Sequence, residues 1–136
     1  MISDLLQEIE DLIGSDYFEY DMEEKMDLIK AEGAGIETVT PLLQIMERHP
    51  LDDFGMPGAM VHFIEAFDPD YEIYLVESLK RRPALHTVWM LNRCINGNSR
   101  KDEYINLLNE IANREDIEKE INNSAKEFID FQTKTK

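Results

Sequence analysis

Two groups of residues have types and spacings that resemble metal ligands. His62 and Glu65 lie three residues apart, which on a helix brings an imidazole and a carboxylate to one side. A dinuclear metal centre in a helical bundle needs several such pairs, and the sequence offers this one. The acids of segment 68–72 alternate as in a calcium-binding loop, but the sixth position is not glycine and Leu79 stands at the twelfth. We therefore predict no metal ion and no other cofactor.

Groups for nucleophilic catalysis or phosphate binding are equally scarce. The single cysteine, Cys94, lies in the apolar run 88–95 without a general base beside it, so we expect a buried core thiol. The basic run Lys80-Arg81-Arg82 is explained by the negative end of the helix that precedes it. The sequence contains no glycine-rich phosphate loop and no nucleophile elbow. We predict that the protein is not an enzyme and does not bind nucleic acid directly.

Acidic and aromatic residues stand side by side in three segments, 16–24, 52–54 and 67–72. This mixture is typical of a contact surface that buries aromatic anchors and pairs with Arg or Lys of a partner. The alternative is that the aromatic residues belong to the core and the acids form a solvated rim. The predicted partner-binding residues are Asp16, Tyr17, Glu19, Tyr20, Asp21, Glu23, Asp52, Asp53, Asp68, Asp70, Tyr71 and Glu72.

Charge is distributed unevenly along the chain, whose formal net charge is −15. Residues 1–78 contain 20 acids and three bases, whereas residues 79–136 contain nine acids and 11 bases. A field of this sign repels nucleic acid and anionic membranes, and it accelerates encounter with a basic macromolecule. We predict a cationic protein partner; the alternative is that the acidity only keeps the protein soluble.

Apolar residues recur three and four positions apart nearly everywhere, which predicts an all-α protein of about eight helices. Pro41 and Pro83 suit first helical turns, and Gly14, Gly33 and Gly97 follow helix ends. Asp68 is expected to cap the fifth helix and Ser99 the seventh. The first helix is expected over about residues 2–13 and the third from Thr38 or Thr40 to His49, while the second, fourth and sixth begin near 19–22, 57 and 84. The eighth runs through Ile117, Ile121, Ala125 and Phe128.

Short connections between these helices favour antiparallel hairpins stacked side by side, in a degenerate HEAT-like array. The alternative is an irregular helical bundle. The sixth helix, apolar on more than one face, should be central. We expect one domain, residues 1–131, and a flexible tail, residues 132–136. The acidic N-terminus does not resemble a secretory signal, and no stretch is long and apolar enough to span a bilayer, so we expect a cytoplasmic protein.

Two segments, Phe54–Glu65 (FGMPGAMVHFIE) and Arg82–Asn96 (RPALHTVWMLNRCIN), carry a resemblance to a known group of proteins. Over about residues 50–112 the chain resembles the small helical immunity proteins of bacterial polymorphic-toxin and contact-dependent growth-inhibition systems. The resemblance implies a non-enzymatic protein of the cytoplasm that binds a cognate toxin domain, often a nuclease, and protects the cell that produces it. Such families share no catalytic motif, so no residue role is carried over.

Charge and resemblance together predict an immunity protein that neutralises a toxin domain, such as a ribonuclease, by tight binding through its acidic N-terminal half. Because a nuclease must present a cationic surface to its polyanionic substrate, an acidic inhibitor can occupy that surface or lie beside it. The alternative function is a HEAT-like adaptor or scaffold without a toxin partner. The sequence leaves the oligomeric state open.

Overall fold

Apolar residues spaced three and four apart produce helices along the whole described chain, so the predicted all-α class is confirmed. The computed structural model describes residues 2–15, 18–54, 58–97 and 100–134. Within these residues there are eight α-helices, one 3-10 helix and no strand. The α-helices are α1 (Ile2–Leu12), α2 (Phe18–Ala31), α3 (Val39–Arg48), α4 (Ala59–Glu65), α5 (Glu72–Arg81), α6 (Leu85–Asn96), α7 (Lys101–Ala112) and α8 (Lys119–Lys134), and the 3-10 helix is Ile36–Thr38.

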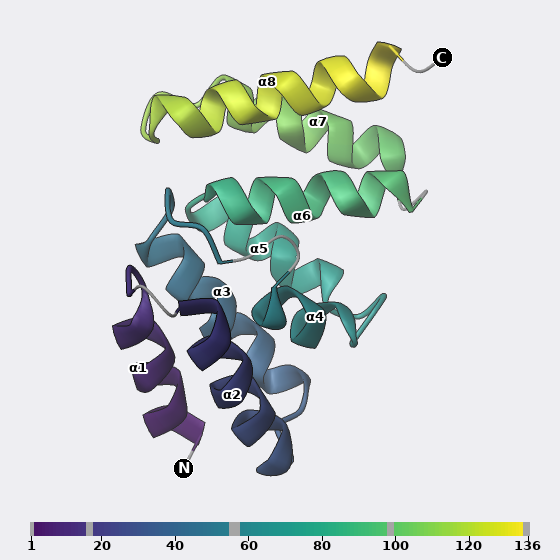
Figure 1. Ribbon diagram of the computed structural model, residues 1–136. Coiled ribbons are helices and arrows are strands. Elements are labelled where there is room, and N and C mark those ends of the chain that lie inside the picture. Colours follow the sequence, from purple (N-terminus) through teal and green to yellow (C-terminus); the bar gives the residue numbers. More distant parts are fainter. Residues whose placement is uncertain (1, 16–17, 55–57, 98–99, 135–136) are drawn as a thin grey trace.

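Each helix packs mainly on helices that are close to it in the sequence. The N-terminal helices α1, α2 and α3 lie at one end of the molecule, and α6, α7 and α8 stack at the other, with α4 and α5 between them (Figure 1). Helix α2 contacts α1 and α4, α3 contacts α1, α5 and α6, and α8 contacts α6 and α7. This arrangement is a helical bundle, and its HEAT-like regularity stays a prediction. None of the described helices combines the length and apolar character that crossing a membrane requires.

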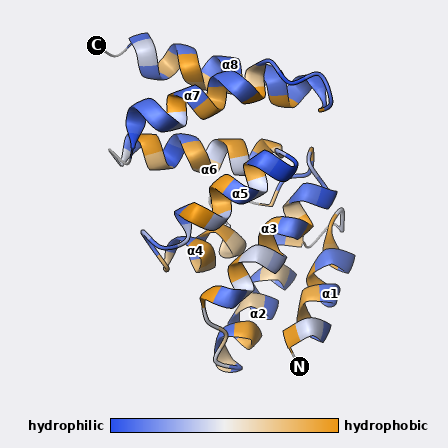
Figure 2. Cartoon of the chain, turned by 180° about the vertical axis from the view of Figure 1, so that it is seen from behind, coloured by the Kyte–Doolittle hydropathy of each residue, from blue (hydrophilic) through white to orange (hydrophobic). Residues whose placement is uncertain are grey.

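Helix α6 lies in the centre of the fold, as predicted. It contacts α3, α5, α7 and α8, and Val88, Met90, Leu91 and Ile95 are almost completely buried on it. Cys94 is 5% exposed, which confirms the predicted core position of the thiol. Figure 2 shows hydrophobic stretches alternating with hydrophilic ones along the helices, the pattern expected when one face of each helix is buried.

The start of α5 differs from the prediction. Asp68 does not cap this helix, because α5 begins four residues later at Glu72 with Tyr71 as its N-cap. The Asp68–Pro69 peptide bond is cis, and the segment forms a turn in which the Tyr71 amide donates to the Phe67 carbonyl. Tyr71 is 4% exposed, and no side-chain hydrogen bond caps the helix. Ser99, the predicted cap of α7, lies outside the described residues.

Helix α8 also extends further than predicted. Helix α8 continues to Lys134, and Gln132, the first residue of the predicted tail, is 4% exposed. The Gln132 amide nitrogen donates to the side-chain oxygens of Asn92 and Asn96 on α6, at 2.8 Å each. The charged and polar composition of residues 132–136 concealed these contacts, which correct the predicted boundary at residue 131.

Candidate partner-binding surface

Helix α2 separates a buried apolar face from a strongly acidic one. Phe18, Met22, Met26 and Ile29 follow one another at spacings of four, four and three, so they share one face and are buried. Four of the five acids of α2, Glu19, Glu23, Glu24 and Asp27, are exposed. A row of three, Glu19, Glu23 and Asp27, repeats every four residues immediately beside the buried face.

This row forms one wall of a groove between α2 and α4 with a volume of about 570 Å³. Met22 and Met26 of α2 and Phe54 of the connector line the floor, and each of these side chains is at most 2% exposed. The opposite wall is formed by α4 and the residue before it, namely Gly58, Ala59 and His62. Lys30 of α2 lies at the end of the acidic row. The groove therefore combines a carboxylate rim with an apolar floor.

The three carboxylates of the row are not paired within the part of the chain that the structure describes. Among the residues that the structure describes, Glu19, Glu23 and Asp27 make no hydrogen bond or ion pair. The nearest base in sequence, Lys25, turns to the other side of α2, where its Nζ lies 2.8 Å from Glu8 of α1. Like charges four residues apart on a helix destabilise it by about 0.2–0.5 kcal/mol per pair. The two like-charge pairs within the row thus oppose helix stability, and the row leaves negative charge available to a partner.

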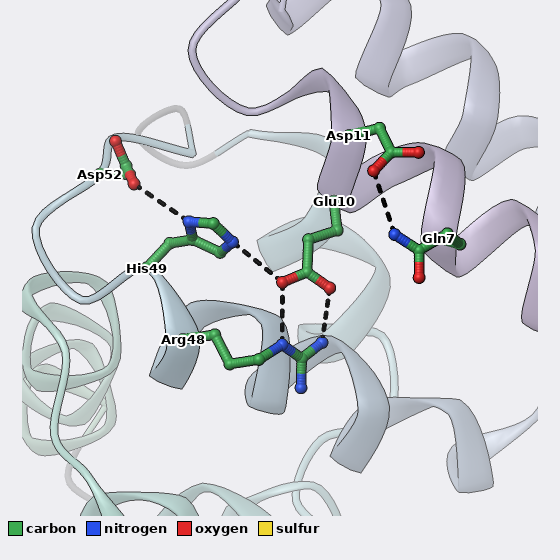
Figure 3. A network of polar contacts seen from close by, with 6 residues as sticks. All are labelled: Gln7, Glu10, Asp11, Arg48, His49 and Asp52. Carbon is green, nitrogen blue, oxygen red and sulfur yellow. Dashed lines mark hydrogen bonds and ion pairs between the residues drawn. The ribbon is translucent and has the colours of Figure 1, made fainter.

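Other acids of the N-terminal half are used inside the fold, and Glu10 of α1 is the clearest case (Figure 3). Its two oxygens accept hydrogen bonds from Arg48 Nε and Nη2 at 2.8 and 2.7 Å, and one of them also lies 2.9 Å from His49 Nε2. The hydrogen bond from Arg48 lowers the pKa of Glu10 despite partial burial. This network joins α1 to the end of α3.

Two further carboxylates bridge the acidic half to the more basic half. Glu47 of α3 accepts hydrogen bonds from Arg81 Nε and Nη2 and from the buried Ser78 hydroxyl, at 3.2, 2.8 and 2.7 Å. Glu65 of α4 accepts two bonds of 2.7 Å from Arg93 of α6. These paired acids fix neighbouring helices and are not available to a partner without breaking contacts of the fold.

The predicted residues of the first segment divide between the exposed surface and the undescribed part of the chain. Glu19, Tyr20 and Glu23 are exposed on α2, with Tyr20 at 73%. Asp21 is half-buried. Asp16 and Tyr17 lie outside the described residues. Of the four predicted residues of this segment that the structure describes, three are therefore exposed on α2.

Asp52 and Asp53 are exposed in the connector after α3. Asp52 Oδ2 lies 3.5 Å from His49 Nδ1, so it takes part in the Glu10 network (Figure 3). Asp53 directly precedes Phe54, whose ring lies in the groove floor. Asp52 therefore belongs to a paired network, and Asp53 is exposed beside a groove residue in the sequence.

The third predicted segment is brought to a different place. Asp68 and Asp70 are exposed in the turn before α5, where they line two other grooves. Tyr71 and Glu72 are a correction, because both are buried, at 4% and 9% exposure. The Tyr71 hydroxyl lies 3.3 Å from Cys94 Sγ, and Glu72 accepts a 2.8 Å hydrogen bond from the Tyr104 hydroxyl. They stabilise the packing of α5 on α6 and α7 and do not lie at the surface.

The structure explains the residues that resembled metal ligands or a nucleophile in the sequence by their contacts and burial within the fold. Glu65 is held by Arg93, so it does not form a free ligand pair with the exposed His62. Burial raises the pKa of the Cys94 thiol to about 11, which keeps the sulfur protonated and unreactive. In the described part of the chain, no three His, Cys, Asp or Glu side chains converge as a metal-binding group.

Several groove residues were missed by reasoning from the sequence. Asp27 continues the row of Glu19 and Glu23 by one further turn, a signal that the four-residue spacing already contained. Met22 and Met26 were recognised as a buried face but not as the floor of a groove. Ala59 could not be found in this way, because its role depends on how α4 packs against α2.

Comparisons with protein-family models, with curated proteins and with solved structures find no match for this chain. Its function is therefore argued from its own residues.

Proposed function

We propose that this protein is an immunity protein, which binds a cognate toxin domain stoichiometrically and neutralises it. The partner is a basic protein, such as a ribonuclease, and the two meet in the cytoplasm of the cell that makes the immunity protein. The observation that carries the proposal is the row of three carboxylates on α2, which form no hydrogen bond or ion pair with the described residues, beside a groove with an apolar floor. The protein acts by covering its partner, without catalysis of its own.

Electrostatics favours such a partner. A nuclease domain carries cationic surface because it must bind phosphates, and an acidic protein competes for the same surface. The negative field accelerates encounter, and buried contacts at the groove slow dissociation. The cost of placing three like charges along one helix also favours a binding role, since a purely solubilising acid could stand at a spacing without repulsion.

The test is co-purification with the toxin domain encoded by the adjacent gene, followed by affinity measurements at two salt concentrations. We expect a one-to-one complex whose affinity falls as salt rises. The combined variant Glu19→Gln, Glu23→Gln, Asp27→Asn should weaken binding roughly tenfold, since each exposed charge pair contributes a fraction of a kcal/mol to about 1 kcal/mol.

The matched control is Glu120→Gln, Glu127→Gln, Asp130→Asn on α8, which removes the same charge from exposed positions of another helix. It should leave affinity nearly unchanged. Equal losses of affinity in both variants would show that the α2 carboxylates contribute to binding only through the overall charge of the protein. Absence of any toxin gene beside this one, with binding to an unrelated basic protein instead, would favour the adaptor function.

A further inference from the structure

We infer that the groove between α2 and α4 receives a cationic amphipathic helix of the partner, with basic side chains against the α2 row and an apolar side chain against the floor. This inference rests on the proposed function, because it specifies which part of a basic partner the acidic surface recognises. It assigns the contact to a single groove rather than to the acidic half as a whole.

The shape of the groove suits one helix. The α2 residues that line it run from Glu19 to Lys30, a length of about 16 Å along the helix axis. Gly58 and Ala59 on the α4 side carry no side chain beyond Cβ, so a partner backbone can approach closely there. A segment of roughly 11 residues in helical form spans this length, as in other helix-in-groove complexes.

Charge complementarity selects a basic occupant, and the spacing of the acids suggests its pattern. Glu19, Glu23 and Asp27 stand about 6 Å apart along α2, the rise of four helical residues. Lys or Arg repeated every four residues on a partner helix matches this interval. Lys30 at the end of the row opposes a cation, so the basic part of the partner lies over positions 19–27.

The floor gives the site its apolar component and a way to change shape. Met22 and Met26 are flexible side chains that adapt readily to an inserted group. Phe54 packs edge-on against Phe18 and His86, with ring centroids 6.1 and 5.4 Å apart. An apolar partner side chain can therefore contact Phe54 once the methionine ends move aside.

Phe54 also connects the groove to a spectroscopic reporter. His86 lies between Phe54 and Trp89, with its ring centroid 5.2 Å from that of Trp89. Trp89 is the single tryptophan of the chain. A ligand that shifts Phe54 changes the surroundings of His86 and hence the emission of Trp89, whereas a ligand that only neutralises the carboxylates leaves the emission unchanged.

The experiment titrates the full-length protein with a synthetic, tryptophan-free helical peptide of about 12 residues, with arginine at every fourth position and leucine beside each arginine. Calorimetry measures affinity, and Trp89 fluorescence reports on the floor. We expect one-to-one binding with a change in emission. A scrambled peptide of identical composition should bind at least fivefold more weakly, and equal binding of the two would overturn the inference.

Ala59→Gln places a neutral, longer side chain in the groove without altering its charge. It should weaken both the peptide and the toxin domain severalfold. The control Leu28→Gln changes an exposed residue of α2 that does not line the groove, and it should have no effect. A toxin that binds both variants with wild-type affinity refutes the helix-in-groove contact but leaves the immunity function intact. Binding of the peptide without any toxin binding refutes the function and leaves the groove assignment standing.

Discussion

The acids of α3 and α4 and the acids of α2 have different surroundings, although both groups belong to the same strongly negative half of the chain. Glu47 and Glu65 each accept two hydrogen bonds from an arginine of the other half. Glu19, Glu23 and Asp27 accept none from any described residue. The net charge of a region is thus a poor guide to its binding surface, because the paired acids hold helices together and only the unpaired ones are free to attract a partner.

The largest effect on the unfolding free energy is expected when the pH is lowered, because a histidine next to the groove and the paired acids then respond in different pH ranges. Burial lowers the pKa of His86, next to the groove floor, from 6.5 to about 4. The unfolded chain therefore binds a proton below pH 6.5 that the folded protein rejects, so stability falls as pH drops toward 4. The pKa of Glu10 is lowered from 4.5, so the stability that its network contributes is lost only below that pH.

We predict that the unfolding free energy decreases by roughly 2–3 kcal/mol between pH 7 and 4.5 because of His86. Urea denaturation at several pH values measures this loss. His86→Leu should abolish most of the slope in this window, since Nε2 is buried without a hydrogen-bond partner in the described structure. An unchanged slope in that variant would contradict the prediction and assign the loss to carboxylates.

Removing a paired acid should cost nearly as much. Glu47→Ala leaves the buried Ser78 hydroxyl without its acceptor and Arg81 without its carboxylate. We expect a loss of about 2 kcal/mol, measured by urea denaturation at pH 7. Glu47→Gln keeps an oxygen for Ser78 and should lose about half as much. A loss below about 0.5 kcal/mol for the alanine variant would be no larger than the contribution of an ordinary exposed ion pair. Such a result would show that the paired acids are not structural.

The uncharged contact of Gln132 with α6 tests whether contacts that join helices stabilise the fold even without charge. Gln132→Ala removes two hydrogen bonds from α8 to α6, so the buried Asn92 side-chain oxygen loses the hydrogen bond that it accepts from Gln132. We expect a loss of about 1 kcal/mol. The control is Thr133→Ala, whose exposed hydroxyl donates to carbonyls of its own helix, and it should change stability little. Equal effects would contradict the role of the α6–α8 contact.

Helix positions followed from the sequence because they depend on local spacing. The apolar rows of α2 and α6, and the glycines that close α2 and α6, are visible without any knowledge of packing. The start of α5 was not predictable in this way. Asp68-Pro69 has the composition of a helix cap, but the burial of Tyr71 against Cys94 overrides it.

The candidate site was predictable in its charge but not in its boundaries. Glu19 and Glu23 were identified from their acidic and aromatic neighbours, and they do lie on the exposed face of α2. Composition could not distinguish them from Glu72, which is buried and receives a hydrogen bond from Tyr104. Whether an acid is free or paired depends on which helices become neighbours, and that information is not local.

The smallest expected effect bears most directly on the unpaired row. Glu23 has an acid four residues before it and another four residues after it, so neutralising it relieves two repulsions. We expect Glu23→Gln to raise the unfolding free energy by about 0.5 kcal/mol at low salt, and the gain to disappear near 1 M salt, where screening acts within about 3 Å. Glu120→Gln gives the opposite sign, because Glu120 lies in the first turn of α8, where a carboxylate is stabilised by the helix dipole. Urea denaturation of both variants at two salt concentrations measures the difference. A gain for Glu23→Gln combined with weaker partner binding would mean that the row is maintained against its cost to the fold, whereas a loss of stability would place Glu23 among the paired, structural acids.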